Sequence, residues 1–165
     1  MKADKLYLVG FMGAGKSTVA RALGARIGWR VEDIDVRIEA RERRSVATIF
    51  AQSGEAYFRQ AERQVLTDLL PQRELIVATG GGTFVEADNR ALMLADGAVA
   101  WLDVPLERVF QRVPADGRRP LASDRAQMQL MFDRRQLAYA EAHMRIDASG
   151  RVADVVERLL EWIDF

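Results

Sequence analysis

The sequence predicts an α/β fold, a three-layer αβα sandwich built on a central parallel sheet of about five strands. Short apolar runs alternate with longer segments of helical spacing along the whole chain. This alternation is typical of a parallel sheet that helices cover on both faces. The chain has 165 residues, 49% of them hydrophobic, and no linker-like or low-complexity segment divides it. We therefore expect a single domain over residues 1–165 with a sizeable core.

The expected strands are five short segments. LYLV, LIVA and AVAWLDV are brief, strongly apolar runs, as buried strands of a parallel sheet are. RVEDID could hold a short strand, and MRIDA is expected to form the last one. The five strands are predicted at residues 6–9, 30–35, 74–78, 98–104 and 144–148.

The expected helices show four-residue apolar spacing and recognisable ends. In the first of them, Val19, Leu23 and Ile27 recur four residues apart, and Gly28 is a plausible stop. Ser45 has the residue type of an N-cap. The helices are predicted at residues 17–28, 35–44, 45–54, 55–70, 86–95, 105–113, 125–142 and 152–163.

Composition excludes several classes of function. The 24 basic residues balance 24 acidic ones, which argues against a general nucleic-acid binder. The absence of cysteine excludes disulfides, thiolate catalysis and cysteine zinc sites, and a single histidine, His143, excludes a two-histidine metal site. His143 is expected to have a structural or surface role. No run approaches the roughly 18–20 apolar residues of a membrane span, so we expect a cytoplasmic protein with no membrane partner.

GFMGAGKS, residues 10–17, matches the pattern G-x-x-x-x-G-K-[ST] between a predicted strand and a predicted helix. In such a loop, glycines let successive backbone N–H groups point at phosphate oxygens, and the helix adds its positive end. Lys16 would bridge the terminal phosphates of a nucleotide, and Ser17 would offer its hydroxyl to Mg²⁺. The alternative is a glycine-rich turn that binds nothing, but the context favours nucleotide binding.

Asp33 and Asp35 follow the second predicted strand, at the sheet edge where ligands of α/β proteins bind. One carboxylate could orient water on Mg²⁺, and the other could accept a proton from a hydroxyl nucleophile. The alternative is that one or both cap the helix that follows. The sequence leaves both interpretations open.

Several arginines are candidates for binding anions. Arg59 lies on a predicted helix, where it could equally pair with Glu55 or Glu62 on a solvated face. Arg118 and Arg119 lie in an irregular basic segment that could form a lid over a triphosphate or an ordinary surface loop. Arg134 and Arg135, on the next helix, read as surface charge when taken alone.

The glycines Gly80, Gly81 and Gly82 follow the third predicted strand, in ATGGGTF. Three glycines in a row destabilise regular structure, so a bulge or tight turn would explain them. A second interpretation is that backbone without Cβ atoms approaches a polar ligand and presents N–H groups to its oxygens.

Together these blocks resemble the shikimate kinase family from end to end. The resemblance rests on GFMGAGKST, DIDVRIE, GEAYFRQAE, ATGGG, RRPLA and RRQL…MRID, in that order. It implies a P-loop NTPase fold like that of the nucleoside-monophosphate kinases, with a substrate-binding region at about residues 35–62 and a lid at about residues 113–125. It also implies a monomer that phosphorylates the 3-hydroxyl of shikimate with MgATP. The alternatives are a kinase of another hydroxy acid, such as gluconate, and a non-catalytic nucleotide-binding module.

The resemblance also implies roles for individual residues. The nucleotide residues would be Gly13, Ala14, Gly15, Lys16, Ser17, Thr18, Arg112 and Arg119; the metal residues Ser17 and Asp33; the acceptor residues Asp35, Arg59, Gly80, Gly81, Gly82 and Arg134; and the catalytic residues Lys16, Asp35 and Arg119. One departure affects Arg134. The family usually reads R-x-P-L-Y at this helix, whereas this chain reads RRQLAY, with Gln136 in the place of the proline. Arg135 is therefore a rival for the same role.

Overall fold

A computed structural model describes residues 1–112 and 122–164. Its centre is one sheet of five parallel strands in the order β2-β3-β1-β4-β5. The strands are β1 (Lys5–Val9), β2 (Arg30–Asp33), β3 (Leu75–Ala78), β4 (Ala98–Asp103) and β5 (Met144–Asp147). The helices are α1 (Lys16–Ile27), α2 (Ile34–Glu42), α3 (Val46–Leu69), α4 (Ala87–Asp96), α5 (Leu106–Gln111), α6 (Ala122–Tyr139) and α7 (Val152–Trp162).

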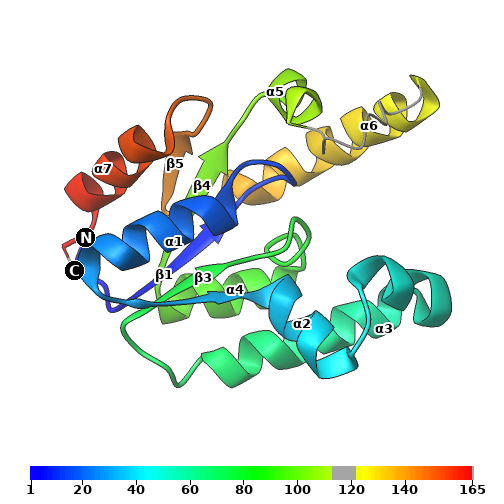
Figure 1. Ribbon diagram of the computed structural model, residues 1–165, viewed down its shortest axis with the longest axis horizontal. Coiled ribbons are helices and arrows are strands. Elements are labelled where there is room, and N and C mark those ends of the chain that lie inside the picture. Colours follow the sequence, from blue (N-terminus) through cyan, green and yellow to red (C-terminus); the bar gives the residue numbers. More distant parts are fainter. Residues whose placement is uncertain (113–121, 165) are drawn as a thin grey trace.

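The sheet lies between two layers of helices. Figure 1 shows α1 and α7 over one face of the sheet and α4 over the other, with the two chain termini side by side. The ends of the chain are joined by a bridge between Lys2 and Asp164. The predicted α/β sandwich with five parallel strands is therefore confirmed.

The central strands are buried on both faces, which is why they read as continuous apolar runs. In β1, Leu6, Tyr7, Leu8 and Val9 have no exposed surface, and all four residues of β3 are buried. The edge strand β2 has no fully buried residue, in keeping with its polar sequence. The third and fourth predicted helices are joined in α3, but Gly54 interrupts the helix with φ of 83°, where a residue with a Cβ would be strained.

The single histidine has a structural contact. The backbone N–H of Val99 in β4 donates to Nδ1 of His143 at 3.1 Å, just before β5 begins. This contact agrees with the structural role expected for it. Among the described residues, no helix combines the length and the apolar character that a membrane crossing requires.

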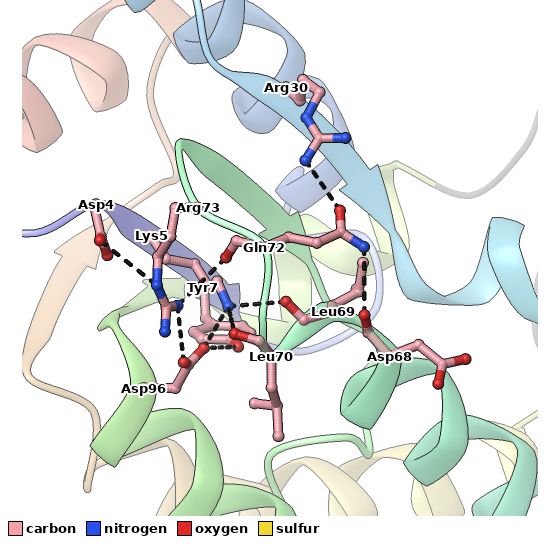
Figure 2. A network of polar contacts seen from close by, with 10 residues as sticks. All are labelled: Asp4, Lys5, Tyr7, Arg30, Asp68, Leu69, Leu70, Gln72, Arg73 and Asp96. Atoms are coloured by element: carbon pink, nitrogen blue, oxygen red, sulfur yellow. Dashed lines mark hydrogen bonds and ion pairs between the residues drawn. The ribbon is translucent and has the colours of Figure 1, made fainter.

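The buried ammonium group of Lys5 lies at the amino ends of the strands, opposite the edge where the loops meet. Lys5 has no exposed surface, and its Nζ donates to the carbonyls of Leu69 and Leu70 and to Oδ2 of Asp96 at 2.6 Å (Figure 2). The hydroxyl of Tyr7 donates to the same carboxylate oxygen. Lys5 thus adds a donor to two carbonyls at the end of α3, of which that of Leu69 also accepts the N–H of Gln72 at 3.1 Å. It ties α3 and α4 to β1.

We expect Lys5→Met to lower the free energy of unfolding by about 3–5 kcal/mol, because it leaves the Asp96 carboxylate largely buried without its main partner. Lys2→Met, at an exposed position close by, is the matched control and should change stability by less than about 0.5 kcal/mol. Urea unfolding of both variants measures the difference. Equal losses of stability in the two variants would contradict the stabilising role assigned to Lys5.

The same cluster should make stability fall in acid. Burial works against the Asp96 carboxylate, but hydrogen bonds from Lys5, Tyr7 and Arg73 outweigh it and hold the pKa of Asp96 below its usual value. A lowered pKa adds stability at neutral pH, and that stability is lost as the pH falls below about 4. Lys5→Met should therefore cost less stability at pH 3 than at pH 7.

Candidate active site

Two loops and the start of a helix meet at the carboxyl edge of the sheet. The phosphate loop, residues 10–17, follows β1; the glycine turn, residues 79–85, follows β3; and α2 begins directly after β2. Because β2, β3 and β1 are neighbours and parallel, their carboxyl ends open into one region. Figure 1 shows the phosphate loop and the glycine turn at the same end of the sheet, between α6 and the pair α2 and α3.

The phosphate loop has the backbone that its glycines predict. Gly10, Gly13 and Gly15 have φ values of 146°, 75° and 91°, which residues with a Cβ rarely adopt. Lys16 is buried, and its Nζ donates to the carbonyls of Gly10 at 2.6 Å and Phe11 at 3.0 Å. Burial lowers the pKa of Lys16 to about 8, although Asp35 and Asp33 oppose the shift. An anion in this loop would favour the charged lysine.

Asp33 serves two partners at once. Its Oδ1 accepts the N–H of Val36 and caps α2, so the helix-cap interpretation is correct for this residue. Its Oδ2 accepts the hydroxyl of Ser17 at 2.5 Å. Among the described residues, no group of three or more acidic or histidine side chains could hold a metal. A single hydroxyl and carboxylate suit Mg²⁺, which keeps several waters and shares the oxygens of a phosphate.

Asp35 lies in the first turn of α2, between two cavities. One, of about 330 Å³, is lined by the phosphate loop, and the other, of about 360 Å³, contains Arg59. Oδ1 of Asp35 is buried without a hydrogen-bond partner among the described residues. Burial, together with the nearby carboxylates of Asp33 and Glu62, raises the pKa of Asp35 to about 6, although Lys16 opposes the shift. An unpaired buried oxygen beside a phosphate loop is where a ligand hydroxyl would donate.

Arg59 projects from α3 into the second cavity. Its Nη1 donates to Oε1 of Glu62 at 2.8 Å, and its buried Nε has no hydrogen-bond partner among the described residues. Burial disfavours the charge, but Glu62 and then Glu55 outweigh it and raise the pKa of Arg59. Both predicted pairings occur, yet Glu62 has no exposed surface, so the solvated-face interpretation is wrong for that partner.

A protein-family model described as shikimate kinase matches residues 12–164. The chain belongs to the shikimate kinase family. It is 42% identical to a shikimate kinase of Persephonella marina over 147 residues, which are 88% of this chain and 90% of that relative. A shikimate kinase of Synechococcus elongatus is 40% identical over 163 residues, 96% of this chain and 85% of that relative. As a member of this family, the chain is an ATP-dependent kinase.

Solved structures agree with this family. Shikimate kinase from Acinetobacter baumannii in complex with shikimate has a TM-score of 0.89 and 34% identity, and the match covers 96% of this chain and 92% of that one. A gluconokinase from Sinorhizobium meliloti has a TM-score of 0.60 and 16% identity over 95% of this chain and 89% of its own. At that identity the likeness shows a shared fold alone.

The second arginine is where the structure departs from the predicted alignment with shikimate kinases. Arg135, not Arg134, lines the 360 Å³ cavity with Asp35 and Arg59. Arg134 is exposed and does not line that cavity; it borders a cavity of about 390 Å³ that Arg59 and Arg135 also line. Tyr139, one turn beyond Arg135, donates its hydroxyl to the carbonyl of Gly81 at 2.5 Å. The four-residue spacing of Arg135 and Tyr139 matches that of arginine and tyrosine in R-x-P-L-Y, and it could have identified Arg135 from the sequence.

The three glycines make room for charged side chains. A Cβ on Gly80 would lie 2.8 Å from Oδ1 of Asp35, one on Gly81 would lie 2.6 Å from Nη1 of Arg135, and one on Gly82 would lie 2.5 Å from Nη1 of Arg59. None of the three has a positive φ, so the backbone itself does not require glycine there. The segment does turn, because the N–H of Thr83 donates to the carbonyl of Gly80 at 3.3 Å and the N–H of Val85 to that of Gly82 at 3.1 Å. The space that the charged side chains occupy explains why the three residues are glycines.

One detail of the prediction is wrong. The N–H of Gly80 is not free for a ligand, because it donates to Oγ1 of Thr83 at 3.1 Å. The sequence analysis named Glu62 as a possible partner of Arg59, but it missed Thr83 and the contact of Tyr139 with Gly81. The contacts of Thr83 with Glu62 and of Tyr139 with Gly81 join residues 21 and 58 positions apart, so sequence spacing does not show that these residues touch.

We expect Gly82→Ala to fold and to raise the KM of the phosphoryl acceptor by about 10- to 100-fold, since a misplacement of about 1 Å can cost up to about 10²-fold. The new methyl group would displace the flexible end of Arg59 rather than backbone. The KM for ATP should change little. Gly80→Ala is the comparison variant, because it would crowd Asp35 and lower kcat instead. Unchanged acceptor kinetics in folded Gly82→Ala would show that Arg59 adapts freely.

The predicted nucleotide residues border a third cavity, of about 370 Å³, which is lined by the phosphate loop and the start of α7. Arg112 lies across it, with Nη1 donating to the carbonyl of Gly13 at 2.8 Å and Nη2 to that of Ala148 at 3.4 Å. Thr18 and Ala14 also line this cavity, as predicted residues of the nucleotide site in shikimate kinases would. Arg119, the predicted lid arginine, and most of the predicted lid lie outside the described residues.

Proposed function

We propose that this chain transfers the γ-phosphoryl group of ATP to the 3-hydroxyl of shikimate, giving shikimate 3-phosphate and ADP on the route to chorismate and the aromatic amino acids. The observation that carries the proposal is the 360 Å³ cavity, in which Asp35, Arg59 and Arg135 meet beside the phosphate loop. Shikimate is a small carboxylate with three hydroxyl groups, so it needs cations for one end and a carboxylate near the other.

Arg59 and Arg135 bind the shikimate carboxylate in this proposal. A guanidinium group meets a carboxylate through two parallel N–H bonds, which fix orientation as well as adding affinity. The Nε of Arg59 supports this role, because it is a buried donor without a hydrogen-bond partner among the described residues and lies only within ion-pair distance, 3.6 Å, of Glu55. Arg135 takes the place that the sequence analysis gave to Arg134.

Asp35 positions the reacting hydroxyl. The acceptor oxygen forms a bond to the γ-phosphorus while the bond from that phosphorus to the β–γ bridging oxygen breaks. The hydroxyl proton passes to the Asp35 carboxylate, and ADP leaves. Because the transition state of phosphoryl transfer is loose, positioning contributes more than basicity.

The phosphate loop and its neighbours hold the nucleotide. Lys16 neutralises charge that moves from the γ-phosphate towards ADP. Ser17 and Asp33 would hold Mg²⁺, which supplies positive charge to the phosphates when bound. Arg112 packs beside the adenine in the 370 Å³ cavity.

The remaining parts of the proposal concern larger segments. Residues 35–62 form the acceptor-binding region, whereas the predicted lid at about residues 113–125, with Arg119, lies mostly outside the described residues. Both belong to one kinase domain, residues 1–165, which acts in the cytoplasm as a monomer.

An ADP-release assay with MgATP tests the function. Shikimate should support turnover, whereas gluconate and other hydroxy acids should not. No shikimate-dependent ADP would refute the proposal. Turnover with gluconate would make the chain a kinase of another hydroxy acid, and ATP binding without turnover on any acceptor would make it a nucleotide-binding module.

A further inference from the structure

Thr83 connects the glycine turn to the arginine side of the acceptor cavity. Its Oγ1 accepts the N–H of Gly80 at 3.1 Å and donates to Oε2 of Glu62 at 2.8 Å. The other oxygen of Glu62 accepts from Nη1 of Arg59 at 2.8 Å. Thr83 and Glu62 have no exposed surface. A chain of hydrogen bonds therefore runs from the backbone beside Asp35 to the guanidinium group of Arg59.

The direction of this chain is fixed by the chemistry of its members. A carboxylate is only an acceptor, so the single hydroxyl proton of Thr83 must point at Glu62. The lone pairs of Thr83 then remain for Gly80. A buried carboxylate is tolerated only when both of its oxygens have partners. Thr83 supplies the partner for one oxygen of Glu62, and Arg59 supplies the partner for the other.

We propose that Thr83 is a positioning residue for the phosphoryl acceptor. Its hydroxyl holds the Glu62 carboxylate in the orientation that aims Arg59 into the cavity, and it holds Gly80 where Asp35 needs space. Thr83 is fully buried, so it acts through these neighbours and does not touch the acceptor. The inference rests on the proposed function, because it takes the cavity to bind a hydroxylated carboxylate.

Two variants at the same position test the hydroxyl separately from the volume. Thr83→Val keeps the shape and removes the hydroxyl, whereas Thr83→Ser keeps the hydroxyl and removes a methyl group. We expect Thr83→Val to raise the shikimate KM by about 10-fold or more, with the ATP KM within about twofold, because buried polar networks lose more than one bond when a member is removed. Thr83→Ser should stay within about threefold of the parent protein on both constants.

A readout without substrate accompanies the kinetics. Exchange of the Gly80 amide hydrogen, followed by NMR, should be faster in Thr83→Val by about 10-fold or more and nearly unchanged in Thr83→Ser, since only the former removes the acceptor of that N–H. If Thr83→Val does not fold, Thr83→Cys takes its place, because a thiol is a weak donor of similar size.

The possible outcomes distinguish the positioning role of Thr83 from the proposed phosphorylation of shikimate. A parent protein that releases no ADP with shikimate would overturn the proposed function, and the exchange experiment would still decide the contacts of Thr83. A parent that turns over, with Thr83→Val or Thr83→Cys leaving the shikimate KM unchanged, would overturn the positioning role alone. A loss shared equally by Thr83→Ser would also overturn it, because volume rather than the hydroxyl would then be responsible.

Discussion

Asp35→Asn is expected to lower kcat for shikimate phosphorylation by about 10²- to 10⁴-fold, the usual contribution of a general base. The buried, unpaired Oδ1 of Asp35 lies between the cavity of the phosphate loop and that of the arginines. Asparagine has nearly the same shape but cannot accept the hydroxyl proton. Steady-state kinetics with saturating MgATP measure the change. A loss confined to the shikimate KM would mean that Asp35 binds the acceptor without taking part in transfer.

The same substitution should make the protein more stable. Because the pKa of Asp35 is raised to about 6, ionisation costs stability above that pH, and the cost disappears as the pH falls from about 6 towards about 4. Asp35→Asn should therefore raise Tm by a few degrees at pH 8 and by less at pH 4. Calorimetry of the metal-free protein measures both values. A gain in stability with a loss of kcat is the signature of a strained functional group, and a lower Tm at pH 8 would contradict it.

The sequence predicts the fold and the nucleotide half of the site better than the acceptor half. Strand and helix periods are local, and the phosphate loop is a continuous block whose glycines carry their own backbone requirement. The acceptor cavity is assembled from α2, α3, the glycine turn and α6, so its geometry depends on packing between distant segments. Asp33 illustrates the limit, since its two proposed roles, helix cap and partner of Ser17, are compatible once both oxygens are placed.

The glycine turn shows what packing adds to a pattern. From the sequence, Gly80–Gly82 could be a tight turn or a ligand-binding backbone, and both interpretations concern the glycines themselves. In the structure each glycine faces a charged side chain of the site, and those side chains come from three different helices. No single-sequence rule relates a glycine to an arginine more than 50 residues away. The choice between Arg134 and Arg135 differs, because the four-residue spacing of Arg135 and Tyr139 is a sequence signal for the side of α6 that faces Gly81.

Arg135→Ala is expected to raise the shikimate KM by roughly 10- to 100-fold, which corresponds to about 1.5–3 kcal/mol for hydrogen bonds to a charged group. Arg134→Ala is the matched control on the same helix and should change the shikimate KM by less than about threefold, as exposed charges contribute little. Neither variant should alter the ATP KM strongly, because the described nucleotide cavity is lined by other residues.

Three features decide between the two arginines. Nη1 of Arg135 occupies the space that a Cβ on Gly81 would fill, and Tyr139 holds the carbonyl of that glycine from the next turn of α6. Arg134 is exposed and is absent from the lining of the 360 Å³ cavity that contains Asp35. Binding of shikimate to both variants, measured by calorimetry alongside the kinetics, separates affinity from turnover. A larger loss of affinity in Arg134→Ala would reverse the assignment and restore the alignment that places Gln136 at the proline position of the family.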